Sequence, residues 1–184
     1  MLDTLYELDW QEMRTSKLSF MKLARSALFH SSEELRWFLD HGAELTHSDL
    51  QSIGWSSTFS SEAVQALITH REGDISIFAR TGMLQKAAEH NKIELLKVLL
   101  DAGADPNEEL DALPMDRGES PTLALRDAIV GGSEGAIRLL LEHGAKIELV
   151  GRDSREKAVT MARRTLGDTV AKFIEQHKAI KSRM

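Results

Sequence analysis

The stretch LQKAAEHNKIELLKVLLDAGADPN, residues 84–107, decides the fold because its pattern returns as LRDAIVGGSEGAIRLLLEHGAKIE at residues 125–148. When the two are laid over one another without a gap, Gly103 meets Gly144. A third copy, LARSALFHSSEELRWFLDHGAELT, begins at Leu23. Self-similarity at such intervals is typical of an array of structural repeats.

Each copy predicts a pair of helices. The second half of a copy places apolar residues at helical spacing, as Leu96 and Leu99 show. Gly103 stands just past the last apolar position, where the chain leaves a helix through a left-handed residue that only glycine adopts cheaply. Gly42 and Gly144 occupy the same place in the other two copies. The sequence therefore predicts short helix pairs that end at a glycine.

These residues resemble the ankyrin repeat family, whose unit of about 33 residues is a β-turn and two helices with a T-P-L-H-x-A opening. The match is closest in residues 84–107, where Ala87-Ala88, Leu99-Leu100 and Gly103-Ala104-Asp105 fall on the family's pattern. Asn107 stands where the family's hairpin usually has asparagine. In some ankyrin proteins this asparagine is hydroxylated, so the resemblance also makes Asn107 a candidate site of hydroxylation.

The copies depart from the family at their openings. No copy has T-P-L-H, since the third unit opens GMLQ at Gly82 and the fourth opens LALR at Leu123. The hydrogen bonds of the family's Thr and His must therefore come from other groups. The second unit is degenerate, with Trp55-Ser56 in place of alanines and Arg71-Glu72 in place of the Gly-Ala exit.

The predicted architecture is an all-α, ankyrin-like helical-repeat solenoid of about five helix-turn-helix units. A long inter-repeat loop follows Asn107, and the last unit turns polar and basic, as a terminal cap should. The expected segments are an N-terminal cap helix at 1–20, units near 21–45, 50–74, 82–107, 123–148 and 157–178 within an array at 21–178, and a tail at 179–184.

Composition excludes several classes of function. The 184 residues hold 23 Lys plus Arg and 29 Asp plus Glu, and a net charge of −6 argues against nucleic acid as a partner. The absence of cysteine excludes disulfides, thiolate zinc sites and a cysteine nucleophile. No run approaches ~18 apolar residues, and the acidic start suits neither a secretory nor a transit peptide. We expect a cytoplasmic or nuclear protein without a membrane partner.

The sequence shows no motif for catalysis, a cofactor or a metal. It contains no phosphate-binding glycine loop, no H-E-x-x-H and no G-x-S-x-G, and GGSEGAI at Gly131 is expected to be a turn between helices. His41 and His143 each precede an exit glycine, at a helix end where a cation is favoured, so both are expected to be structural. Glu108-Glu109 are expected to be loop charges. We expect no enzyme activity, although triads are spatial and leave the question open.

The resemblance implies that the concave face of the array binds another protein. Stacked repeats present such a surface, and in ankyrin-type units hairpin tips and first helices line it. The candidates on this face are Arg25, Leu28, Phe29, Trp55, Ser57, Phe59, Arg80, Thr81, Lys86, Glu89, His90, Asp127 and Val130. In the loop at 107–121, Met115 and Arg117 suggest a binding finger, with a passive insertion as the other interpretation.

Two interpretations remain for the aromatic residues of the second unit. Trp55 and Phe59 either anchor a partner or fill the space left by missing consensus residues, whereas Trp37 is expected in the core. The alternative function is a small-molecule-binding protein or unusual enzyme, with a pocket around the second unit and the 107–121 loop. The sequence names neither the partner nor the oligomeric state.

Overall fold

The computed structural model describes residues 17–54, 56, 58–110, 122–150 and 157–181. Within these ranges every regular element is helical, and only an isolated bridge joins Leu110 to Thr122. The helices are α2 (Lys17–His30), α3 (Ser32–Asp40), α4 (His47–Ile53), α5 (Ser61–His70), η1 (Ser76–Phe78), α6 (Met83–Glu89), α7 (Ile93–Asp101), α8 (Ala124–Val130), α9 (Glu134–Glu142), η2 (Ile147–Leu149), α10 (Ala158–Leu166) and α11 (Asp168–Lys181). The predicted all-α class is confirmed.

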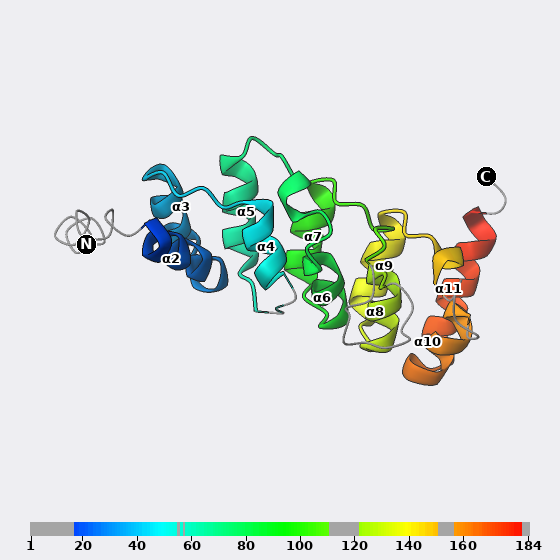
Figure 1. Cartoon of the computed structure of the whole chain (residues 1–184). Coiled ribbons are helices and arrows are strands. Elements are labelled where there is room, and N and C mark those ends of the chain that lie inside the picture. Colours follow the sequence, from blue (N-terminus) through cyan, green and yellow to red (C-terminus); the bar gives the residue numbers. More distant parts are fainter. Residues whose placement is uncertain (1–16, 55, 57, 111–121, 151–156, 182–184) are drawn as a thin grey trace.

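The helices follow one another in pairs along an elongated row (Figure 1). The second helices form one layer, in which α3 packs on α5, α5 on α7 and α7 on α9. In the other layer, α6 packs on α8 and α8 on α10. Each pair therefore buries its apolar side mainly against its neighbours in the row, and one hydrophobic cluster runs from Ala24 to Ile174.

Local signals start and stop the helices. Thr46 caps α4 through a reciprocal capping box with Asp49. The exit glycines Gly42, Gly103 and Gly144 have φ of 88°, 99° and 92°, so their predicted left-handed conformation is confirmed. None of the helices in the described ranges is long and apolar enough to cross a bilayer.

The ends of the row differ from the expected boundaries. Helix α2 begins at Lys17, inside the segment expected to be a separate cap helix, and residues 1–16 of that segment lie outside the described ones. Helix α11 continues to Lys181, three residues into the expected tail. Both helices are 14 residues long, which makes them longer than the helices of the interior pairs α6–α7 and α8–α9.

The second unit leaves its last helix through a strained residue. Glu72 has φ of 56° and Gly73 has φ of 87°, so the chain makes a left-handed exit although Arg71-Glu72 replaces the Gly-Ala pair. A residue with a Cβ loses about 1 kcal/mol in this conformation.

We therefore expect Glu72→Gly to stabilise the protein by up to about 1 kcal/mol, because glycine relieves this strain. For a chain of this size the midpoint of thermal unfolding should rise by about 2–4 °C, measured by circular dichroism. Gln65→Gly is the control, since Gln65 is an exposed residue within α5, where glycine should lower the midpoint instead. An unchanged or lower midpoint for Glu72→Gly would contradict the strain.

Candidate functional site

The first helices α6 and α8 bring five of the expected partner-binding residues to neighbouring positions. Lys86, Glu89 and His90 belong to α6 or its C-cap, and Asp127 and Val130 to α8. Small buried alanines on both helices allow them to pack side by side (Figure 1). We call Lys86, Glu89, His90, Asp127 and Val130 the first-helix face.

This face combines an exposed apolar side chain with charged ones. Val130 is 54% exposed, whereas Ala128 and Ile129 beside it are fully buried. The Nζ atom of Lys86 lies 2.6 Å from Oε2 of Glu89, and His90 Nε2 lies 3.9 Å from the same oxygen. Apolar and charged side chains occur together in protein interfaces.

Arg25 lies farther along the row and bridges two helices. Its Nη1 atom is 3.5 Å from Oδ1 of Asp49, which joins α2 to α4. Burial raises the pKa of the Asp49 carboxyl, but hydrogen bonds from Thr46 and the charge of Arg25 outweigh burial and lower the pKa overall. Arg25 therefore already serves a structural contact.

Several expected surface residues are instead part of the core. Phe59 is 6% exposed, and its ring stacks on that of Phe29 with centroids 4.6 Å apart. This favours the packing interpretation of Phe59. Leu28 and Thr81 are fully buried, and the Thr81 hydroxyl donates to the carbonyl of Phe78.

The remaining aromatic and loop candidates have different outcomes. Trp37, expected in the core, is only half-buried; it packs against the core, and its ring stacks on His41 with centroids 4.0 Å apart. Trp55, Ser57, Met115 and Arg117 lie outside the described residues.

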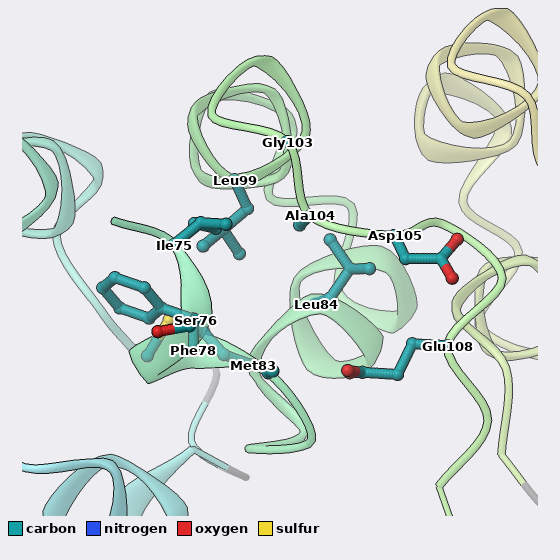
Figure 2. Close-up of a pocket in the computed structure, with 11 residues that line it drawn as sticks. Ile75, Ser76, Phe78, Met83, Leu84, Leu99, Gly103, Ala104, Asp105 and Glu108 are labelled. Carbon is teal, nitrogen blue, oxygen red and sulfur yellow. The ribbon is translucent and has the colours of Figure 1, made fainter. Parts of the chain in front are cut away.

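A cavity that the sequence did not predict lies between two connecting segments. Its volume is about 210 Å³, and the connection from Ile75 to Ala79 faces the segment from Gly103 to Glu108 across it (Figure 2). Met83 and Leu84 of α6 and Leu99 of α7 complete an apolar lining. We call this the inter-loop cavity.

Two carboxylates, Asp105 and Glu108, also line the inter-loop cavity. Oδ1 of Asp105 accepts a hydrogen bond from the backbone N–H of Asn107 at 2.9 Å. Glu108 is half-buried, which corrects its expected role as a solvated loop charge.

Burial raises the pKa of the Glu108 carboxyl above its ordinary value of 4.5. The backbone N–H and the guanidinium of Arg80 lower it, Asp105 raises it and His47 lowers it, but burial prevails. Ionisation of Glu108 therefore lowers the stability of the folded protein.

Removing this charge should stabilise the protein at neutral pH. A carboxyl with a raised pKa in the folded state contributes stability below its unfolded pKa, near 4.5, and that contribution is lost as the pH rises through the folded pKa. We expect Glu108→Gln to melt at a higher temperature than the parent at pH 7 and at the same temperature at pH 4. Glu94→Gln, at an exposed position of α7, is the control. A lower melting temperature at pH 7 would show that the Glu108 charge is stabilising.

Adjacent units are also joined by hydrogen bonds between their loops. Asn107 Oδ1 accepts from the backbone N–H of Lys146 at 2.7 Å, and Asn107 Nδ2 donates to the carbonyl of Gly144 at 3.3 Å. Ser133 Oγ donates to the carbonyl of Glu89 at 2.7 Å. Both polar atoms of the Asn107 amide are thus engaged in holding one loop to the next.

His41 and His143 are structural, as expected. Each is the C-cap of its helix, and each ring Nδ1 lies within hydrogen-bond distance of the carbonyl four residues earlier. The Leu139 carbonyl and the nearby Asp101 carboxylate raise the pKa of His143 despite partial burial. Among the described residues no group of three or more His, Cys, Asp or Glu is placed to hold a metal ion.

No protein-family model matches the chain, and no curated protein matches it in sequence. The function therefore has to be argued from the first-helix face and the inter-loop cavity.

The sequence held only a weak signal for the cavity. Asp105 and Glu108 are visible as acids in a loop, but their apolar surroundings come partly from Ile75 and Phe78, about one unit earlier in the chain. The two segments meet only when the units stack.

Proposed function

We propose that this protein is an interaction module, an ankyrin-like solenoid that binds another protein through its first-helix face. The observation that carries the proposal is Val130, which is 54% exposed on α8 beside the charged groups of α6. A large aliphatic side chain on an open helix face gains free energy when a partner covers it, and the surrounding charges select which partner fits.

Hydrogen bonds of two side chains support the ankyrin-like assignment. Gln85 stands where the family's opening has His, and its Nε2 donates to the carbonyl of Glu108 at 3.3 Å. Asn107 stands where the family's hairpin has Asn, and it links its own loop to the loop after α9. The Gln85 bond replaces one that the family's His would make, and the Asn107 bonds support stacked units with aligned loops.

The size of the inter-loop cavity argues against a drug-sized ligand in that cavity. Pockets for drug-sized ligands measure about 300–1,000 Å³, and this cavity measures about 210 Å³. Its lining provides one hydroxyl, that of Ser76, and the two carboxylates, in otherwise apolar surroundings. A single side chain of another protein fits the inter-loop cavity better than a cofactor or a substrate of ordinary size.

The test is capture of a partner by variants of the first-helix face. Bound proteins would be identified by mass spectrometry with the whole chain as bait, and the affinity of the recovered partner would then be measured by calorimetry. We expect Lys86→Glu and Val130→Asp to weaken binding of that partner at least tenfold, because each removes complementarity at the proposed contact.

Matched controls lie on the second helices. Lys97→Glu on α7 and Gln65→Asp on α5 make similar changes at exposed positions away from the first-helix face. Circular dichroism verifies that all four variants fold. Equal binding by face variants and controls would refute the assignment of the interface to α6 and α8.

A further inference from the structure

We propose that the inter-loop cavity receives a lysine side chain of the protein partner. The inference rests on the proposed function, since it names a group that the partner must carry.

The walls suit an aliphatic stem. Ile75, Phe78, Leu84 and Leu99 surround the cavity with hydrocarbon, and Met83 closes the lower part in Figure 2. Four methylene groups placed against such walls gain free energy from burial. Lysine commonly buries this stem along apolar surface while its ammonium group reaches a polar site.

The Glu108 carboxylate supplies the site for the ammonium group. In Figure 2 the Glu108 side chain extends toward Met83, whereas the carboxylate of Asp105, which also lines the cavity, points away from Leu84. Both come from the same segment, so the negative charge lies on one side of an otherwise apolar cavity. A guest with an apolar stem and one cationic end complements this distribution of charge.

The charges already near Glu108 do not offset its burial. Arg80 and His47 both favour the carboxylate, and Asp105 opposes it. The net effect is still a raised pKa, so the favourable charges and hydrogen bonds around the carboxylate do not offset the cost of burying it. An ammonium group bound beside Glu108 would supply a further favourable charge for the buried carboxylate.

An ammonium group matches these acids better than a guanidinium. The Asp105 carboxylate already accepts from the backbone N–H of Asn107, and the Glu108 carboxylate accepts from that of Arg80. A guanidinium binds best when both oxygens of one carboxylate are available to its planar fork. A lysine ammonium group is a compact charge with rotatable donors, so it can use the acceptor capacity that remains on the Glu108 carboxylate.

The experiment is a methyl NMR titration of the whole chain with Nα-acetyl-lysine methylamide as the probe. We expect saturable shifts of the Ile75, Leu84 and Leu99 methyl signals. The norleucine derivative, which keeps the stem without the charge, and the arginine derivative should bind more weakly. Glu108→Gln should reduce the affinity for the lysine probe roughly tenfold, whereas Glu94→Gln should leave it unchanged.

Three results would overturn the proposal: equal binding of the norleucine derivative, tighter binding of the arginine derivative, or an unchanged affinity in Glu108→Gln. Because the probe is a single amino-acid derivative, the titration does not depend on the first-helix face. If Lys86→Glu and Val130→Asp leave partner capture intact while the lysine probe still binds, the proposed interface fails and the cavity assignment stands.

Discussion

Replacing Gly131 with alanine is expected to destabilise the protein by about 3 kcal/mol or more, because there is no space for a methyl group at this position. A Cβ atom built on Gly131 would lie 2.1 Å from the carbonyl oxygen of Glu89 and 2.9 Å from its carbonyl carbon. These are backbone atoms at the end of α6, so relief requires α8 to move away from α6. The midpoint of thermal unfolding should fall by about 6–12 °C.

Gly144→Ala is the matched control. Gly144 is left-handed, with φ of 92°, but a Cβ atom there would meet nothing within 4 Å. Its replacement should lower stability by only about 1 kcal/mol through backbone strain. If the two variants melt at the same temperature, the close approach of α8 to the end of α6 does not limit stability.

The two glycines also show how far the sequence predicts this fold. The role of Gly144 is local, since a left-handed exit follows from its place after an apolar helix, and the structure confirms it. Gly131 was expected only as part of a turn between helices. Its close contact with Glu89 involves a residue 42 positions earlier, and nothing in the spacing of GGSEGAI shows that approach. A sequence pattern within one unit therefore does not predict the contacts between units.

The candidate site likewise contains residues that the sequence predicts and residues that it does not. Lys86, Glu89 and Val130 follow from the place of the first helix in the family that the units resemble, and the structure places them on neighbouring helices. Phe59 occupies a surface position in the repeat pattern, but the ring of Phe29 from the preceding unit covers it. Glu108 looked like a loop charge because its apolar surroundings come partly from Ile75 and Phe78, about one unit earlier in the chain.

Ile137→Ala and Ile174→Ala remove the same atoms from equally buried sites, yet we expect them to affect different lengths of the chain. Both isoleucines are 0% exposed, Ile137 in α9 and Ile174 in α11. Each substitution should cost about 2–5 kcal/mol at its own unit. In a solenoid each unit is stabilised by its neighbours, so a weakened interior unit also uncouples the units beyond it.

Hydrogen exchange followed by mass spectrometry distinguishes the two outcomes. Ile174→Ala should accelerate exchange in α10 and α11 and leave α3, α5 and α7 protected. Ile137→Ala should accelerate exchange in α8 and α9 and also in α10 and α11, because α10 packs on α8. A single cooperative core would instead show the same acceleration in every helix for both variants, and the solenoid proposal would then fail. The comparison thus tests the nearest-neighbour stacking on which both the first-helix face and the inter-loop cavity depend.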